Sequence, residues 1–530
     1  MTNEKSPLGQ YFTPPHIAEI MVGLLQSGKG EWILEPSSGT GVFIEALRTQ
    51  RYENVCAVEL DGTLVNYEAD EMHVESFVSW TPTHKFSAVI GNPPYIRWKN
   101  LDKSQQEEIK LSRYWGELFN SLSDYLMVFI VNAVDALRTG GELIFVTPSF
   151  WFHTQHAQPV RDFLTSNGYF TDIVTFGEAQ VFEKVSSSIV IFRYVKSHDP
   201  KPAITLFQFH GTRRVQAPLK LREPKQFTVA EIPQFSVGAH WTLATAQQQA
   251  ALKRFEDWTT ISSGISETLF EAQGPNQLGQ FVNIANGMVS GLDRAFRVPE
   301  DLRNRLPESE KDALRVVAKG ANLTRLVTRE VTLYIDVPQG LSEIEFRTRY
   351  PTIATHLDGF REVLEERFSY GRKLPFWEWA FRRSESFFLD GRQKVFVPCK
   401  ERITNKSHVR FSLVPLGAVA TQDVTALAPL PSTRESVEYI SAFLTLDEVS
   451  HWIRDKGLIK GGVAEFSERP LASIPFRPIE WSSHCERQCH DEIVEIVRSA
   501  TVSDPAELVF KQIREIFLNR LGLGPAVRDE

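Results

Sequence analysis

The residues Asn92–Tyr95, with the sequence Asn-Pro-Pro-Tyr, place two hydrogen-bond acceptors and an aromatic ring directly after an apolar run. The side-chain oxygen of Asn92 and the backbone carbonyl of Pro93 can accept the two N–H groups of one amine. An exocyclic amine on an aromatic ring is a poor nucleophile because its lone pair is delocalised, and two such acceptors would draw it toward sp³ geometry. Pro93 and Pro94 restrict the backbone and make the acceptors rigid. The motif predicts activation of an amine, with Tyr95 stacked on the ring that carries it.

A second group of residues has the character of a nucleoside site. Gly39 and Gly41 follow an apolar run and precede a helix-like segment, where glycines let a ligand approach the backbone. Glu59 comes 20 residues after Gly39, at the end of the next apolar run, and an acid there accepts hydrogen bonds from ribose hydroxyls. Glu35 would repel a phosphate and suit a cation, and the third glycine and the lysine of phosphate loops are missing. We therefore expect S-adenosylmethionine, a sulfonium with a ribose, and no metal.

These residues need a sheet to bring them together. Helix-like segments at 41–50 and 123–141 separate strand-like segments in the first part of the chain. The expected strands are residues 31–36, 54–60, 72–78, 86–91, 142–148, 170–176 and 186–194. This alternation predicts an α/β fold with a parallel, doubly wound sheet, which binds ligands beyond the carboxyl ends of its strands. The regularity fades after Tyr194.

Together, the motifs resemble those of the gamma-type adenine-N6 DNA methyltransferases. The matching segments are Gly9–Met21, Glu35–Phe43, Asn92–Tyr95 and, later, Phe182. Only 33 positions separate Glu59 from Asn92, so the recognition domain must come last, as in the gamma order. On Asn92–Tyr95 alone, a plain proline turn would be an alternative; the combination favours the family.

The resemblance implies an architecture and a set of residue roles. It implies a seven-stranded, Rossmann-like methyltransferase domain (residues 1–240) and a separate mixed α+β DNA-recognition domain (residues 241–530). Thr13 would contact the methionine end of the cofactor, and Phe77 and Phe129 its adenine. Ser76 stands where the family has an acid for the adenine amine. The implied catalytic residues are Asn92, Pro93, Pro94, Tyr95 and Phe182, and the implied cofactor-binding residues are Thr13, Glu35, Gly39, Gly41, Glu59, Ser76, Phe77, Asn92 and Phe129.

The C-terminal half contains a basic, aromatic segment. Residues 367–410 hold 11 Lys or Arg against 4 Asp or Glu, a local net charge of +7, although the whole chain carries −8. Basic side chains neutralise phosphates, and interleaved aromatic side chains can contact bases. The segment predicts a DNA-facing surface, and the alternative is a core with a solvated basic rim. Residues 281–298 and 457–476 also resemble recognition domains of restriction–modification methyltransferases.

Composition narrows the remaining possibilities. Four cysteines in 530 residues are too few for a disulfide scaffold, which predicts a reducing, cytoplasmic setting, and the resemblance implies that the cell is bacterial. No segment predicts a membrane span or a secretion signal. His484, Cys485, Cys489 and His490 could suggest zinc, but two of them lie one helical turn apart and no second ligand pair follows. An ordinary helix face is the favoured interpretation of this group.

The favoured function is transfer of a methyl group from S-adenosylmethionine to N6 of a flipped-out adenine in double-stranded DNA. It would protect host DNA from a separately encoded endonuclease, and we expect a monomer without a fused nuclease domain. A methyltransferase for RNA or for a protein glutamine amide would share Asn92–Tyr95 but would not need the large C-terminal half. A catalytically silent DNA-binding protein is the third possibility.

Overall fold

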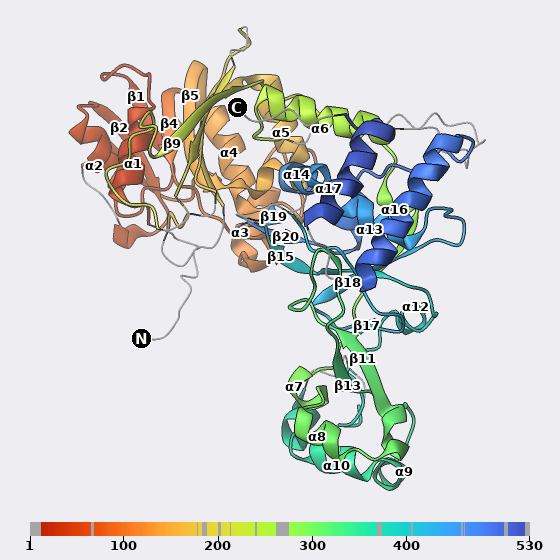
Figure 1. The fold of residues 1–530 in the computed structure, drawn as a ribbon. Helices are drawn as coiled ribbons and strands as arrows, with labels where there is room; N and C mark the ends of the chain where they lie inside the picture. The colour runs from red at the N-terminus through yellow and green to blue at the C-terminus, as the bar shows by residue number, and fades with distance from the viewer. Residues whose placement is uncertain are drawn as a thin grey trace. The chain divides into compact units, whose positions relative to one another are not determined.

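The structure is a computed structural model, and it divides the chain into two compact units (Figure 1). Unit 1 comprises residues 1–249 and 459–462, and unit 2 comprises residues 250–458 and 463–530. The described residues are 12–64, 68–177, 179–182, 188–199, 203–211, 214–238, 241–260, 275–367, 371, 374–403, 406, 408–456, 459–460, 462–502 and 507–524. None of the helices in these ranges combines the length and the apolar character that crossing a bilayer requires.

Unit 1 contains a nine-stranded sheet with the order β3-β2-β1-β4-β5-β7-β6-β8-β9. β3, β2, β1, β4 and β5 pair in parallel, and the chain order reverses between β1 and β4. Such a reversal opens a crevice at the carboxyl ends of the strands. The strands are β1 (Trp32–Glu35), β2 (Asn54–Glu59), β3 (Glu71–Val74), β4 (Phe86–Gly91), β5 (Leu137–Pro148), β6 (Tyr169–Thr175), β7 (Ile189–Val195), β8 (Ile204–Phe209) and β9 (Phe227–Ile232).

Two features of this sheet correct the predictions. The sheet has nine strands instead of the predicted seven. The two additional strands are β8, which pairs in parallel with β6, and β9, which pairs antiparallel with β8. β9 buries only its two end residues, so it lacks the apolar run that would reveal it in the sequence. The sheet is also not entirely parallel, since β7 runs antiparallel to both β5 and β6. No helix occurs among the described residues between β6 and β7, and an antiparallel pair needs no crossover helix.

Two hydrophobic clusters cover the two faces of the sheet. Side chains alternate along a strand, so Leu34 joins the cluster that contains α4 and α5, whereas Ile33 joins the cluster that contains α1 and α2 (Figure 1). The helices of unit 1 are α1 (Pro15–Gly23), α2 (Val42–Thr49), α3 (Lys103–Lys110), α4 (Tyr125–Ala136) and α5 (Gln158–Asn167). The sheet is thus covered on both faces, as the predicted doubly wound α/β class requires.

The helix predicted at 123–141 ends earlier than its sequence pattern indicates. α4 stops at Ala136, and Leu137 is already extended and pairs with Phe86 of β4. Ten of the twelve residues of α4 are buried, which explains its nearly continuous apolar sequence. The short helix α3 begins at a capping box, in which Asp102 and Gln105 each bond the other's backbone N–H.

Unit 2 is mixed α+β. Its larger sheet has the order β10-β18-β14-β16-β12, a smaller one has the order β13-β11-β17, and β15 pairs with β20. The strands are β10 (Val282–Asn286), β11 (Leu314–Ala318), β12 (Leu326–Val327), β13 (Thr332–Ile335), β14 (Val395–Pro398), β15 (Lys400–Arg402), β16 (Ser412–Leu413), β17 (Val419–Ala420), β18 (Val424–Pro429) and β20 (Val463–Glu465); the short β19 (Ile459–Lys460) falls in unit 1. The remaining helices are α6 (Ala246–Thr259), α7 (Asp293–Phe296), α8 (Glu300–Arg305), α9 (Glu343–Arg349), α10 (Pro351–Asp358), α11 (Arg361–Glu366), α12 (Glu385–Phe388), α13 (Val437–Leu444), α14 (Asp447–Lys456), α15 (Glu468–Ala472), α16 (His484–Val502) and α17 (Glu507–Glu515).

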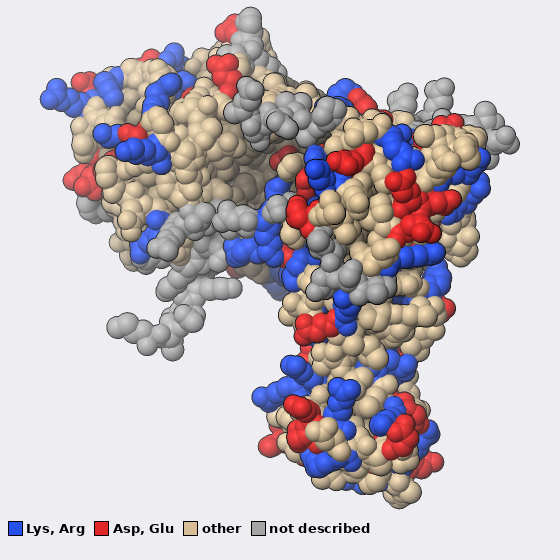
Figure 2. Space-filling model, in the orientation of Figure 1, with Lys and Arg blue, Asp and Glu red and all other residues tan. Residues whose placement is uncertain are grey.

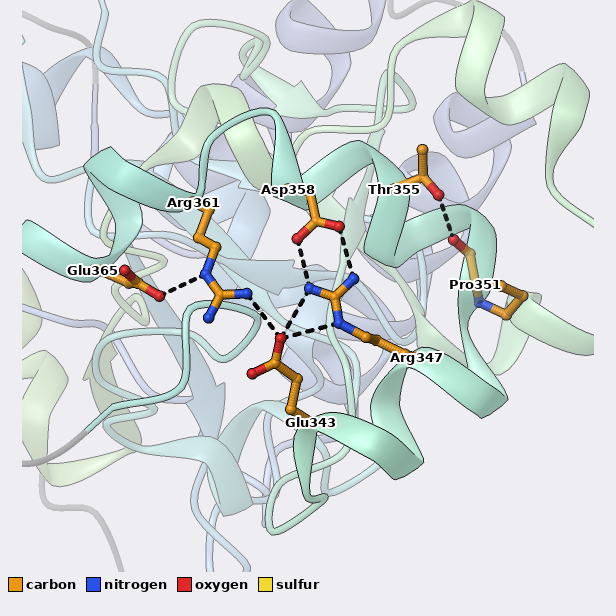
Figure 3. Close-up of polar contacts among 7 residues, drawn as sticks. All are labelled: Glu343, Arg347, Pro351, Thr355, Asp358, Arg361 and Glu365. Atoms are coloured by element: carbon orange, nitrogen blue, oxygen red, sulfur yellow. Dashed lines mark hydrogen bonds and ion pairs between the residues drawn. The ribbon is translucent and has the colours of Figure 1, made fainter.

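A network of ion pairs joins α9, α10 and α11 (Figure 3). The Glu343 carboxylate lies 2.9 Å from Arg347 and 2.8 Å from Arg361. Arg347 also pairs with Asp358 at 2.7 Å, and Arg361 with Glu365 at 2.7 Å. Positive and negative side chains therefore lie side by side on this part of unit 2, as they do over the α8–α10 region in Figure 2.

We expect Glu343→Gln to lower the melting temperature of the protein, because it leaves Arg347 and Arg361 without their shared carboxylate. Those two arginines hold the pKa of Glu343 below its ordinary value, which means that the ionised form is favoured in the folded state. The measurement is thermal unfolding at low salt and at about 1 M salt, where screening should reduce the difference. Glu308→Gln, which breaks one local pair with Lys311, is the control and should have a smaller effect. An equal effect of both variants would contradict a cooperative network.

The basic, aromatic segment 367–410 does not form the predicted continuous DNA-facing surface. Its buried aromatic side chains are Phe376, Trp377, Trp379, Phe388 and Phe396, and its internally paired cations include Arg382, Arg392, Lys394, Lys406 and Arg410. The prediction is wrong for these residues, since the aromatics fill the core of unit 2 and carboxylates neutralise the cations. Phe381 and Lys400 remain exposed, whereas Phe368, Tyr370, Arg372 and Lys373 lie outside the described residues.

Candidate active site

A pocket lies at the carboxyl ends of β1, β2 and β4, where the strand order reverses. All of its lining residues belong to unit 1. They are Phe12, Pro36, Ser37, Gly39, Glu59, Leu60, Glu75, Ser76, Phe77, Asn92, Pro93, Pro94, Ile96, Gln105, Tyr125 and Phe129. The fold therefore brings the predicted nucleoside residues and the predicted amine acceptors to one cavity, as expected for a doubly wound sheet.

The glycine turn and Glu59 are joined directly. The backbone N–H of Gly39 donates to one Glu59 carboxylate oxygen at 2.7 Å, and the N–H of Asp61 donates to the other at 2.9 Å. A carboxylate offers about four acceptor positions, so Glu59 can also accept from the hydroxyls of a ribose. Gly39 and Gly41 have φ angles of 51° and 82°, which favour glycine. Gly41 does not line the pocket. It is the N-cap residue of α2, so it contributes to the shape of the turn and not to the cavity wall.

One end of the pocket has aromatic walls. The rings of Phe77 and Phe129 lie 5.1 Å apart, and those of Phe129 and Tyr125 lie 5.2 Å apart. Burial raises the pKa of the Tyr125 hydroxyl to about 12, and the nearby Ser76 side chain opposes this rise. Gln105 of α3 lines the same pocket. Apolar walls with a few polar groups suit a purine ring. Ser76 stands where the family has an acid for the adenine amine, and Ser76, Tyr125 and Gln105 offer hydrogen-bonding groups there.

Asn92 and its neighbours form the other side of the pocket. The Asn92 side-chain Nδ2 donates to Thr13 Oγ1 at 3.1 Å, and the Tyr95 hydroxyl contacts Asn92 Oδ1. The Tyr95 hydroxyl also lies 2.7 Å from the carbonyl oxygen of Val146. The Ser37 hydroxyl donates to the Asn92 carbonyl at 3.1 Å. The Asn92 amide is thus held on both its nitrogen and its oxygen.

Glu35 has an unusual environment for an acid. It is fully buried, neither of its side-chain oxygens has a hydrogen-bond partner, and it does not line the pocket. Burial raises the pKa of Glu35 well above its ordinary value, and the nearby Glu59 raises it further. In the ligand-free protein the neutral acid is therefore favoured, and the role of Glu35 toward a cationic cofactor stays a prediction.

Not every predicted site residue reaches the pocket lining. Gly39, Glu59, Ser76, Phe77, Asn92, Pro93, Pro94 and Phe129 line it, whereas Thr13, Glu35, Gly41, Tyr95 and Phe182 do not. Thr13 and Tyr95 do not line the pocket themselves but form hydrogen bonds with the lining residue Asn92. Phe182 is only 2% exposed and packs in the α1–α2 cluster, so a ring that stacks on a base would first have to leave this position.

The structure also shows pocket residues that the sequence analysis missed. Tyr125 precedes Phe129 by one helical turn, so the helical period of α4 could have revealed it. Pro36 and Ser37 lie within the glycine segment already recognised. Gln105 comes from α3, in a polar stretch with no local signal for a ligand.

The possible zinc ligands His484, Cys485, Cys489 and His490 all lie on α16. His490 Nε2 accepts the backbone N–H of Ser436 at 3.2 Å, and its Nδ1 lies 3.0 Å from Asp491. Both ring nitrogens therefore have protein partners, which supports the helix-face interpretation.

A different group, Cys56, Glu71 and His73, brings its ligand atoms within 4.8 Å of one another on β2 and β3. Burial, with Glu71, raises the pKa of the Cys56 thiol to about 12. Metal binding needs a thiolate, whereas the raised pKa favours the protonated thiol. Cys56 is therefore better explained as a buried residue of the apolar core.

Comparisons with known proteins agree with this fold. Residues 42–182 match the family model of the Eco57I restriction-modification methylase, and residues 1–72 match that of the N-6 DNA methylase. The chain is 38% identical over 526 residues to the type II methyltransferase M.HindII of Haemophilus influenzae, covering 98% of both chains. It is 37% identical to M.HincII of the same organism, again over 98% of both chains. The structure of the type IIL restriction-modification enzyme MmeI in complex with DNA has a similar fold, with a TM-score of 0.62 at 10% identity, covering 97% of this chain and 73% of that chain.

The doubly wound sheet and the Asn92 pocket define a methyltransferase. Similarity along nearly the whole chain then shows that this protein belongs to the type II restriction–modification methyltransferases that methylate adenine N6 in DNA. It is a sequence-specific DNA methyltransferase, and the family predicted from its motifs is confirmed.

Proposed function

We propose that the protein binds S-adenosylmethionine in the unit 1 pocket and presents its methyl group to a flipped-out adenine beside Asn92. The observation that carries this proposal is that Glu59 and Asn92–Pro94 line one cavity. Glu59 retains acceptor positions for ribose hydroxyls, and the aromatic walls around Phe77 and Phe129 suit an adenine. These features fit the cofactor, which supplies a methyl group on a sulfonium.

The protein's own residues have separate tasks in this proposal. The Asn92 side-chain oxygen and the Pro93 carbonyl accept the two N–H groups of the target amine and make its lone pair available. Pro93 and Pro94 keep these acceptors rigid, so little reorganisation is needed when the amine arrives. Tyr95 stacks on one face of the base, and Phe182 stacks on the other after leaving its buried position. S-adenosylmethionine would supply a methyl group on a sulfonium leaving group, and the residues around Asn92 would orient the amine in line with it, so positioning would supply most of the rate.

We assign target recognition to the C-terminal part of the chain, residues 241–530, and catalysis to residues 1–240. Support comes from the completeness of the pocket within unit 1, which leaves unit 2 free for DNA contacts. We further propose a cytoplasmic monomer that acts beside a separate endonuclease for the same DNA sequence. Sedimentation of the purified protein would test the monomer.

Methylation-sensitive sequencing of DNA from cells that express the chain tests the reaction and reveals the target sequence together. We expect N6-methyladenine at one short sequence throughout the genome, and none in cells that express Asn92→Ala. Absence of N6-methyladenine with the unaltered chain, or labelling of RNA or protein instead, would overturn the proposal.

Phe182→Ala should weaken stabilisation of the flipped base by about 1–3 kcal/mol, because it removes one of the two stacking rings. The measurement is the fluorescence of 2-aminopurine placed at the target adenine, which rises when the base leaves the duplex. Phe176→Ala removes a buried ring from the same cluster and is the control for packing damage. Unchanged fluorescence with Phe182→Ala would remove this residue from the site.

A further inference from the structure

The side-chain amide of Asn92 is held by two hydroxyls, one from a distant part of the chain and one from the same motif. Thr13, which precedes α1, accepts from Nδ2 at 3.1 Å, and Tyr95 contacts Oδ1. Thr13 is only 8% exposed, so water does not readily replace its contact. An asparagine amide otherwise rotates about its terminal torsion, which has a broad energy profile. These two contacts restrict the amide plane.

The main chain at the same position is also held. The Ser37 hydroxyl, from the turn after β1, donates to the Asn92 carbonyl at 3.1 Å. Pro93 and Pro94 restrict the backbone that follows. With its backbone already held in this way, the remaining freedom of Asn92 is that of its side chain, and this is the freedom that Thr13 and Tyr95 remove.

We propose that the Thr13 and Tyr95 hydroxyls are positioning groups, which hold the Asn92 amide so that its Oδ1 can accept a proton of the target amine. This inference rests on the acceptor role given to Asn92 in the proposed function. It gives Tyr95 a second task beside stacking, and gives Thr13 a task that is separate from cofactor binding.

The Tyr95 hydroxyl has a further useful property. It carries one proton but lies within reach of two acceptors, Asn92 Oδ1 and the Val146 carbonyl 2.7 Å away. When the target amine donates to Oδ1, the Tyr95 hydroxyl can keep its own hydrogen bond to Oδ1, while the nearby Val146 carbonyl helps to hold the hydroxyl in place. A carbonyl oxygen also has two lone pairs, so the amine and Tyr95 do not exclude each other. Asn92 thus stays oriented before and after the base arrives.

The test compares two variants that remove a hydroxyl but nearly keep the shape of the side chain with one variant, Thr13→Ser, that keeps the hydroxyl. They are Tyr95→Phe, Thr13→Val and Thr13→Ser, with Tyr114→Phe as the matched control, because the Tyr114 hydroxyl bonds Asp135 away from the pocket lining. The single-turnover rate of methyl transfer is measured at saturating S-adenosylmethionine and DNA, with the cofactor Kd determined by calorimetry. Thermal melting establishes that each variant folds.

We expect Tyr95→Phe and Thr13→Val to lower the saturated rate about 10-fold, as for one oriented hydrogen bond. Thr13→Ser and Tyr114→Phe should stay within about twofold of the unaltered protein. Fluorescence of 2-aminopurine at the target should be retained in Tyr95→Phe, because the stacking ring is still present. Unchanged saturated rates in both Tyr95→Phe and Thr13→Val would overturn the inference, as would a Thr13→Val effect confined to KM for the cofactor.

A double-mutant cycle separates positioning of Asn92 from any direct effect. In an Asn92→Ala background, Tyr95→Phe and Thr13→Val should cause no further loss, because the group that they position is gone. A full 10-fold loss in that background would contradict the inference while leaving the acceptor role of Asn92 intact. Wild-type activity of Asn92→Ala alone would instead refute the proposed site, whatever the hydroxyl variants do.

Discussion

Asn92→Ala should reduce methyl transfer by about 10²–10³-fold while specific DNA binding is retained. The variant removes one of the two acceptors proposed for the target amine but leaves the Pro93 carbonyl, the cofactor pocket and unit 2 in place. It also removes the donor to the Thr13 hydroxyl and one acceptor of the Tyr95 hydroxyl. The measurement is transfer of a labelled methyl group to DNA under single-turnover conditions, with binding followed by gel shift.

Asn54→Ala is the matched control for this variant. Its side chain donates to the Gly30 carbonyl at 2.7 Å, away from the pocket lining, so the methylation rate should be unchanged. If Asn92→Ala loses DNA binding and methylation together, Asn92 supports the fold or the DNA interface. Retained methylation would remove Asn92 from the chemistry altogether.

Glu35→Gln should stabilise the cofactor-free protein, and the gain should grow with pH. Burial and the neighbouring Glu59 raise the pKa of Glu35 well above its ordinary value of 4.5. Between these two pKa values the folded protein holds a proton that the unfolded chain has released, so stability falls by about 1.4 kcal/mol for each pH unit. Below the ordinary pKa both states are protonated, and the contribution of Glu35 is fully retained.

Glutamine has the same shape as the neutral acid and does not titrate, so the variant should lose this slope. Urea unfolding of both proteins from about pH 5 to pH 8 measures it, since the unfolding free energy is obtained at each pH. Glu53→Gln removes an exposed carboxylate of the same unit and should leave the slope unchanged. Parallel pH profiles for Glu35→Gln and the unaltered protein would show that Glu35 ionises normally in the folded state.

The local patterns of unit 1 could be read from the sequence because its central strands are buried on both faces. The strand at Phe86–Gly91 was predicted with the bounds that the structure shows, and it is buried along its whole length. β8 and the edge strand β9 were not predicted, because both are partly exposed and neither carries a continuous apolar run. The end of α4 was also missed, since the pairing of Leu137 with Phe86 is a tertiary contact.

In the candidate site, too, some features could be predicted from local sequence patterns and others depended on tertiary contacts. The sequence alone determined the family, because Asn92–Tyr95, the glycine turn and Glu59 are short motifs whose residue types the chemistry requires. Only the tertiary structure decided that Glu35 is buried without a partner, that Phe182 packs away from the pocket, and that Thr13 bonds Asn92. It also decided that the aromatic side chains of the basic segment fill a core. Spacing along a chain predicts which residues share a face, whereas burial and hydrogen-bond partners depend on segments distant in sequence, such as the 79 positions between Thr13 and Asn92.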